Sequence, residues 1–205
     1  MENSAIRFWQ WFEAKNKAYL FLSEVTPDVK ESLLDELREQ LHRYHKKLYF
    51  ETGIREDDVP ELIITAEGKS DYFDDVEYLI ARAPKIDNWK FTAFIQPQGV
   101  NFRIHYGEVE LVPEEIWFLP LAHADKPELT GIRVCLKNYE MISDKDGLIS
   151  VIYKMLDTVI GEKSFALDIQ FVDAGLLPDD PEEEGMFELW ELPQYIAWKQ
   201  KARLA

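Results

Sequence analysis

A chain of 205 residues in which 46% are hydrophobic and 13% aromatic can bury a sizeable core, which argues against a disordered protein. Its 23 Lys and Arg residues stand against 39 Asp and Glu residues, and the net charge of -16 repels nucleic-acid phosphates and anionic lipid headgroups. We therefore expect no nucleic-acid and no membrane partner. The acidity leaves three readings open, namely a basic partner protein, a cationic ligand or solubility alone.

Cys135 is the single cysteine, so the chain can form neither an internal disulfide nor a cysteine-based zinc site. We expect its thiol to be packed in the core rather than to act as a nucleophile. Residues 1–17 lack the apolar run of a signal peptide, and the longest uncharged apolar runs are far shorter than a membrane span. The sequence predicts a cytoplasmic protein.

Two helices are predicted at the start of the chain. Ser4 can cap a first helix that runs to about Leu22, and Thr26, which precedes a proline, begins a second helix that ends near Lys47. The apolar residues of both recur at steps of three and four. Together they predict a helical hairpin over residues 4–47.

From Leu48 onward the apolar residues no longer recur at the helical spacing of three and four. Residues 49–52 and 61–66 are short β-prone runs on either side of a charged turn. Ser70 is expected to cap a third helix that Pro84 ends.

Alternating apolar residues predict further strands at 89–96, 102–106, 116–121 and 132–136, with a tight turn at Gly107. Because consecutive strands joined by short turns pair antiparallel, these strands predict a meander.

Ser143, with Asp146 three residues later, resembles a capping box and predicts a helix that ends at Gly161. A last strand is expected over Phe165–Val172. The predicted fold is α+β, a curved antiparallel sheet with helices packed on one face, forming a single domain over residues 1–177.

The chain changes character after Leu177. Residues 177–191 hold seven acidic residues and no basic one, so they carry seven of the 16 net negative charges. The many aromatic residues here argue against a free tail, and we expect 178–205 to run extended, dock back on the domain and end in a short helix around 194–201. Its predicted interaction surface consists of Asp179, Asp180, Glu182, Glu183, Glu184 and Trp190.

Tryptophans in segments of mixed polarity occur near both ends of the chain, at Trp9, Trp11, Trp190 and Trp198. Such residues are typical of contact surfaces. The alternative is that the two terminal segments pack on each other, because exposed tryptophans are costly.

Catalytic signals are sparse. The candidates are Arg103 and His105, which share a strand face, and His123, a loop histidine near an acid that could act as a general base. Surface polar residues and a solvated turn are the competing interpretation. Glu39 and His42 match half of a helical carboxylate metal site, whose second half is missing, so we predict no metal and no cofactor.

Several short segments of the chain form a recognisable set. They are Phe8-Trp9-x-Trp11-Phe12, residues 61–68, Ala83-Pro84 with Trp89-Lys90-Phe91, Leu156-Asp157 with Gly161-Glu162, and Leu192-Pro193-x-Tyr195-Ile196-x-Trp198. Together they resemble a group of small acidic bacterial cytosolic proteins of unknown function. The resemblance covers nearly the whole chain and implies a bacterial protein built as one unit, with no assigned activity or catalytic residue.

Two functions follow as hypotheses. The first is a non-enzymatic interaction module that binds a basic partner, for example in an antitoxin-like or immunity-like role, because charge complementarity accelerates and selects such pairing. The second is a small-ligand binder or hydrolase-type enzyme with a pocket between sheet and helices. The phosphate-loop, nucleophile-elbow and zinc-protease motifs do not occur in the sequence, which favours the first.

Overall fold

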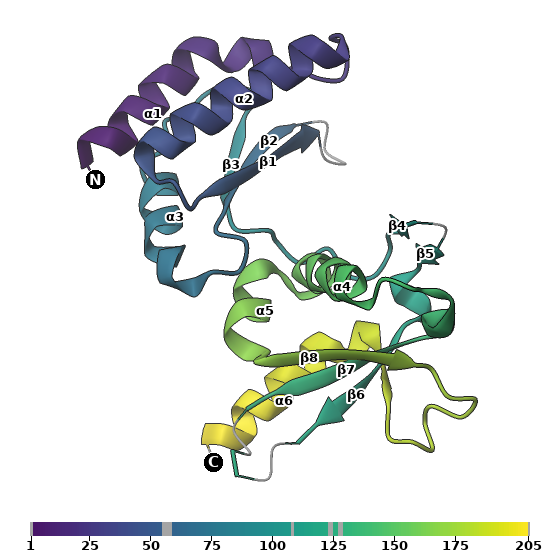
Figure 1. Ribbon diagram of the computed structural model, residues 1–205. Helices are drawn as coiled ribbons and strands as arrows, with labels where there is room; N and C mark the ends of the chain where they lie inside the picture. The colour runs from purple at the N-terminus through teal and green to yellow at the C-terminus, as the bar shows by residue number, and fades with distance from the viewer. Residues whose placement is uncertain (1, 55–58, 108, 123–124, 127–128, 205) are drawn as a thin grey trace. The chain divides into compact units, whose positions relative to one another are not determined.

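The computed structural model describes residues 2–54, 59–107, 109–122, 125–126 and 129–204, and it confirms the α+β class (Figure 1). The backbone divides into two compact units, residues 1–95 and 96–205. The division therefore falls after Ile95, whereas the sequence predicted one domain over 1–177 and a segment that begins at 178. Each unit has its own sheet and its own buried residues, which is why a boundary arises in the middle of the chain.

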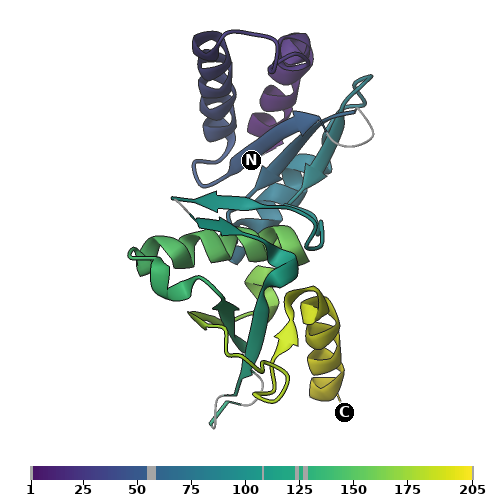
Figure 2. The same ribbon diagram turned by 90° about the vertical axis from the view of Figure 1, so that its right-hand side faces the viewer.

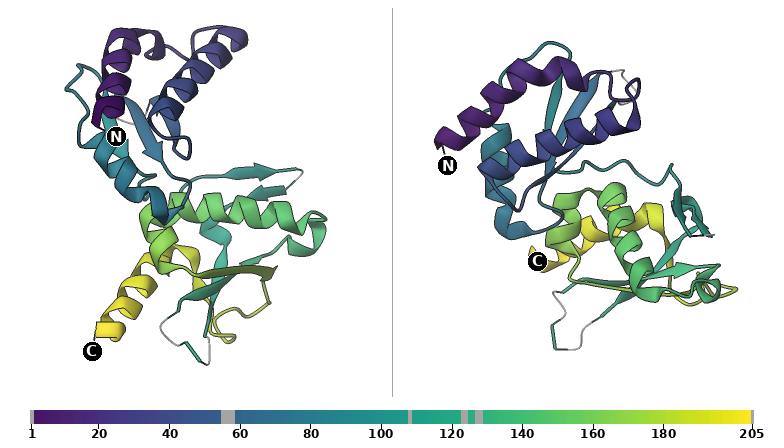
Figure 3. Two further views of the ribbon diagram at one scale, coloured as in Figure 1. Left: turned by 60° about the vertical axis from the view of Figure 1, so that its left-hand side comes forward. Right: turned by 45° about the horizontal axis from the view of Figure 1, so that its top comes forward.

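The first unit opens with the predicted helical hairpin (Figure 3). α1 (Glu2–Lys15) continues into a 3-10 turn, η1 (Asn16–Tyr19), and α2 (Pro27–Tyr44) returns alongside it. Trp11 donates from Nε1 to Glu36 Oε1 at 3.3 Å, and Tyr19 donates from its hydroxyl to the carbonyl of Leu33 at 3.1 Å. These bonds fix the pairing of the two helices.

The sheet of the first unit is mixed rather than a meander. Its strands are β1 (Tyr49–Ile54), β2 (Pro60–Thr65) and β3 (Lys90–Ala93), in the order β1-β2-β3. β2 pairs antiparallel with β1 and parallel with β3. The chain crosses over between β2 and β3 through η2 (Ser70–Tyr72) and α3 (Phe73–Ile80), and a crossover of this kind brings the next strand in parallel. Ser70 begins the 3-10 turn and does not cap α3.

Aromatic rings fill the core of the first unit. Trp9 lies 4.7 Å from Phe91 between ring centroids, and Phe12 lies 5.0 Å from Trp89, both edge-on. The indole of Trp9 also donates to the carbonyl of Leu79 at 2.8 Å. α1 is apolar on more than one side because it packs on both α2 and β3.

The second unit contains two sheets. β4 (Ile104–Tyr106) and β5 (Val109–Leu111) form a hairpin, and Gly107 between them has a φ of +60°, as the predicted turn requires. The larger sheet has the order β8-β7-β6-β9, and its strands are β6 (Trp117–Leu121), β7 (Gly131–Leu136), β8 (Phe171–Leu176) and β9 (Phe187–Glu188). Two short 3-10 turns flank these strands: η3 (Pro113–Glu115) precedes β6, and η4 (Tyr139–Met141) follows β7.

The strand predicted over Phe165–Val172 is wrong over most of its length. α4 (Lys145–Ile160) is followed by a second helix, α5 (Glu162–Asp168), and β8 begins only at Phe171. Phe165 is buried and lies 5.4 Å from Tyr153 between ring centroids. The two helices connect β7 to β8, which therefore pair in parallel and not as a meander (Figure 1).

The N-cap of α4 is Asp144 and not Ser143. Its Oδ1 accepts from the backbone N–H of Gly147 at 2.9 Å, and its Oδ2 accepts from the hydroxyl of Tyr106 at 2.7 Å. These bonds tie the β4–β5 hairpin to the start of α4. A Cβ at position 147 would collide with the Tyr106 hydroxyl and the Asp144 carboxylate, so any residue other than glycine there would displace this pair of side chains.

The carboxyl-terminal segment is packed within the second unit. β9 pairs with β6, η5 (Leu189–Glu191) follows, and α6 (Leu192–Leu204) closes the chain (Figure 2). Leu189, Leu192 and Ile196 are buried in the core of this unit. Residues 181–185 form a turn, so this part of the segment is not extended as expected.

Three of the terminal tryptophans contact rings of their own unit. Trp9 and Trp11 contact rings of the first unit, and Trp198 contacts a ring of the second.

Leu192→Ala should lower the free energy of unfolding of the second unit by about 2–5 kcal/mol, because it empties a fully buried site. Trp198→Ala, at an exposed position one helical face away, should cost less than about 1 kcal/mol. Urea unfolding followed by circular dichroism measures both. Equal losses would contradict the docked arrangement.

Asp144→Asn should flatten the fall of stability in acid. The bonds from Gly147 and Tyr106 hold the pKa of the Asp144 carboxyl below its usual value, so its stabilisation is present above the unfolded pKa of about 4 and is lost as pH falls through the lower folded pKa. The urea midpoint between pH 2 and 5 should therefore change less in Asp144→Asn than in the parent. Ser143→Ala is the control and should follow the parent curve.

Candidate functional site

A groove lined mainly by aromatic side chains opens on the second unit. Its volume is about 530 Å³, and we call it the aromatic groove. Its walls come from β6, β9, η5 and α6, and they consist of Pro120, Phe187, Glu191, Gln194, Tyr195 and Trp198.

The rings of the aromatic groove continue outward from the core. Phe118, which is fully buried, stacks on Phe187 with centroids 5.7 Å apart. Phe187 lies 6.1 Å from Tyr195, and Tyr195 lies 5.8 Å from Trp198. Phe187 is 40% exposed, Tyr195 is half-buried, and Trp198 at the end of the row is 64% exposed. A large ring held by its neighbours yet open to water is a ready anchor for another molecule.

The predicted acidic residues lie on a loop, residues 177–186, that directly precedes β9; we call it the acidic loop. Asp179, Asp180, Glu182, Glu183 and Glu184 are all exposed. The backbone N–H groups of Gly185 and Met186 donate to the carbonyls of Glu182 and Pro181, each at 3.0 Å, and Gly185 takes the left-handed φ of +74° that the turn requires. The loop therefore presents its carboxylates from a hydrogen-bonded frame.

Trp190, the ring predicted for the interaction surface, is 47% exposed, but it does not line the aromatic groove. Its indole donates to Glu188 Oε2 at 2.6 Å. The ring that the sequence reasoning left out of that surface is Trp198. Its signal is the spacing of Tyr195 and Trp198, which places both rings on one face of α6.

Two of the three predicted catalytic residues come together, and they do so on an open surface. Arg103 Nη1 lies 2.9 Å from Glu110 Oε2, and His105 Nε2 lies 3.7 Å from Glu110 Oε1. The side chains of Arg103 and His105 are 61% and 79% exposed, and neither lines the aromatic groove. His123 lies outside the described residues. The arrangement is that of exposed surface contacts rather than of a sheltered acid-base site.

The histidines of α2 make local contacts. His45 Nε2 lies 3.8 Å from Asp75 Oδ2, and the ring of His42 lies edge-on to Tyr49 at 6.2 Å. Among the residues that the structure describes, no group of three or more His, Cys, Asp or Glu side chains is arranged to hold a metal ion.

Cys135 lies in β7 with its thiol buried, as predicted. Burial raises the pKa of this thiol, the negative charge of Asp173 raises it further, and the positive charge of Arg133 partly opposes them. A buried thiol that resists deprotonation is a poor nucleophile.

Glu61 is the one charged residue of β2 and is almost fully buried. Its Oε1 accepts from the hydroxyl of Thr92 and lies 3.2 Å from Lys90 Nζ. Both partners come from β3, the parallel neighbour. The carboxylate therefore joins two strands and has a structural role.

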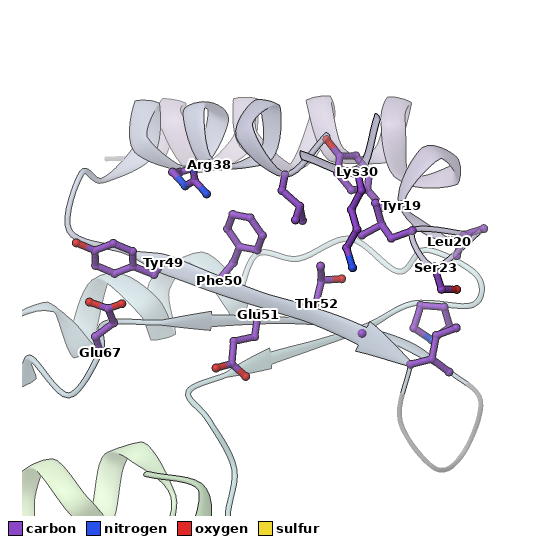
Figure 4. Close-up of a pocket in the computed structure, with 15 residues that line it drawn as sticks. Tyr19, Leu20, Ser23, Lys30, Arg38, Tyr49, Phe50, Glu51, Thr52 and Glu67 are labelled. Carbon is purple, nitrogen blue, oxygen red and sulfur yellow. The ribbon is translucent and has the colours of Figure 1, made fainter. Parts of the chain in front are cut away.

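A larger cavity, of about 730 Å³, lies in the first unit between the helical hairpin and β1 (Figure 4). Lys30 and Arg38 reach toward it from α2, and Phe50 and Thr52 point into it from β1. We call it the α2–β1 cavity. Sequence reasoning missed its polar residues, although positions 30, 34 and 38 follow the four-residue step of one helix face.

Comparison with known proteins adds no relatives. No family model matches the sequence, and no curated protein matches it significantly. The resemblance to small acidic bacterial proteins therefore stays a prediction. Within the described part of the chain, no helix combines the length and the apolar character needed to cross a membrane.

Native protein should react with a disulfide reagent such as DTNB at least about 100-fold more slowly than protein unfolded in guanidinium, because the Cys135 thiol is buried and its pKa is raised. Absorbance at pH 8 follows the reaction, and the single cysteine makes the signal unambiguous. Fast reaction of the native protein would show that the thiol is accessible.

Proposed function

We propose that this chain is a non-enzymatic, cytoplasmic protein-interaction module that binds a basic segment of a partner protein at the aromatic groove. The observation that carries the proposal is the position of an exposed aromatic row, ending in Trp198, directly after the acidic loop in the same docked segment. Protein interfaces are enriched in aromatic anchors at their centre and are surrounded by a polar rim.

The chemistry of the groove fits a basic segment with one apolar residue. The apolar residue would lie against Phe187 and Trp198, where burying each side chain stabilises the complex. Lysine and arginine residues on either side would meet the acidic loop, and a guanidinium could also stack on an exposed indole. The loop's charges would mainly speed encounter and select the partner, while the rings would supply most of the affinity.

The charge is not uniform along the docked segment, which gives the bound segment a direction. The acids end at Glu191, and the bases of α6 begin at Lys199, whose ammonium donates to the carbonyl of Leu129 at 2.5 Å. The basic end of the partner is therefore expected over the acidic loop. An antitoxin-like or immunity-like role against a basic protein is one biological form of this binding.

The second hypothesis has two forms, a hydrolase-type enzyme and a small-ligand binder, and the two forms receive unequal support. The enzyme form finds little support, because Arg103 and His105 are highly exposed and their partner is Glu110. The ligand-binding form is favoured by the α2–β1 cavity, which lies between sheet and helices as that hypothesis requires.

A fluorescein-labelled nonapeptide of lysine and arginine with one central leucine should bind the protein, and the affinity should fall steeply between 50 and 200 mM NaCl. Trp198→Ser should weaken binding about tenfold, as expected for an interface anchor. Neutralising the five acids of the acidic loop to Asn and Gln should weaken binding at 50 mM NaCl by about tenfold and flatten the salt dependence. Fluorescence anisotropy measures each.

Two controls separate a site from general charge attraction. The first neutralises five exposed acids of the first unit, Asp28, Glu31, Asp71, Asp74 and Glu77, and should bind like the parent. The second replaces the central leucine of the peptide with serine and should bind as weakly as the parent peptide binds Trp198→Ser. If both charge variants lose affinity equally, binding at the acidic loop is wrong.

A further inference from the structure

We propose that the α2–β1 cavity binds a small amphipathic anion, a molecule with a carboxylate, sulfonate or phosphate group on an aromatic or aliphatic body. This site is independent of the aromatic groove, since all its residues belong to the first unit. The inference rests on the cationic stripe of α2, the apolar floor of β1 and the size of the space between them.

The cationic stripe follows from helix geometry. Lys30, Leu34 and Arg38 are four residues apart on α2, so they lie on one face, with the two cations about 12 Å apart along the axis. The next positions around the helix, Leu37 and Leu41, are buried in the core. α2 therefore turns one apolar face to its own unit and a second face, with a leucine between two cations, to the cavity.

Both cations, Lys30 and Arg38, have N–H groups that remain available to bind an anion. Lys30 forms no ion pair with any residue that the structure describes. Arg38 lies 2.5 Å from Asp35 through Nη1, but both side chains of this helical pair are more than half exposed. Exposed pairs of this kind are weak, and the guanidinium has further N–H groups for an anion.

Asp35 pairs with Arg38, whereas the two carboxylates that line the cavity, Glu51 and Glu67, lie away from the stripe. Figure 4 shows Glu51 on the side of β1 opposite to Phe50 and Thr52, which face Lys30 and Arg38. Glu67 lies below Tyr49 and its Oε2 is 3.8 Å from Lys69 Nζ. The side of the cavity under α2 is therefore cationic although the chain as a whole is acidic.

The remaining wall is apolar with a few hydroxyls. Phe50 and Leu34 supply the floor and roof, and Tyr19, Ser23 and Thr52 supply oxygen atoms. The hydroxyl of Tyr19 is directed to the Leu33 carbonyl, so Ser23 and Thr52 are the hydroxyls left to a ligand. A volume of about 730 Å³ falls in the range of small-molecule sites, which are mostly apolar with a few fixed polar groups.

The test uses 8-anilinonaphthalene-1-sulfonate, an apolar anion, and N-phenyl-1-naphthylamine, its uncharged counterpart. The folded protein should bind one equivalent of the sulfonate, seen as saturable fluorescence. The Lys30→Met and Arg38→Met double variant should weaken sulfonate binding about tenfold and leave the uncharged probe within about twofold, since methionine keeps most of the apolar stem. Thr52→Trp should weaken both probes because it fills the cavity.

The matched control is the double variant Arg43→Met and Lys46→Met. Arg43 also forms an exposed helical pair, with Glu39 at 2.7 Å, and Lys46 is exposed, so the control removes the same charge away from the cavity. It should bind the sulfonate like the parent. Circular dichroism and the urea midpoint show that each variant is folded.

Three results would overturn the proposal: no saturable sulfonate binding to the folded parent, equal weakening in both double variants, or weakening by Trp198→Ser in place of the α2 variant. The last result would place the probe in the aromatic groove. Peptide binding at that groove should be unaffected by the α2 variant, so failure of the cavity and failure of the proposed docking function are separately visible.

Discussion

A short junction between β6 and β9 is the interaction on which the groove and the loop depend. Only two residue pairs join these strands, Trp117 with Glu188 and Phe118 with Phe187, and the N–H of Leu189 then donates to the carbonyl of Ile116 at 2.9 Å. So few bonds would not hold a segment against its loss of conformational entropy. Burial of Leu189 and Leu192 supplies the rest, and the junction fixes where the acidic loop ends and where α6 begins.

The sequence predicted what periodicity and local chemistry encode. The helical hairpin and the Gly107 turn are both present. The carboxyl-terminal segment packs mainly through Leu189, Leu192 and Ile196, whereas Phe187, Trp190 and Trp198, among the aromatics expected to anchor it, are exposed. The sheet arrangement was not predictable in the same way, because parallel pairing is decided by crossovers and not by the strands themselves. Residues 165–172 show why apolar spacing does not always separate a helix from a strand. Phe165 and Ile169 are as apolar as strand residues, yet Phe165 lies in α5, where it packs against Tyr153.

The charge of residues 177–191 led to the predicted interaction surface, but the sequence did not predict which tryptophan lines the aromatic groove. Composition identified the acidic loop, because acids without bases are visible in the sequence. It favoured Trp190 over Trp198, although both are tryptophans among polar residues, because the distinction depends on which ring continues the row from Phe118. Arg103 precedes β4 and His105 lies within it, so the two do not share a strand as predicted, although both approach Glu110. Their high exposure, which no sequence pattern gives, makes them a surface cluster.

The net charge of the chain and the charges around a single site act over different distances. A total of -16 describes the field at long range, where it favours basic partners. At physiological ionic strength that field is screened over about 8 Å, so a ligand within the α2–β1 cavity would respond mainly to the charges that line it, with Lys30 and Arg38 on the α2 side. One acidic chain can therefore offer an anionic loop to a protein and a cationic stripe to a small molecule, because each charge acts within its own few ångströms.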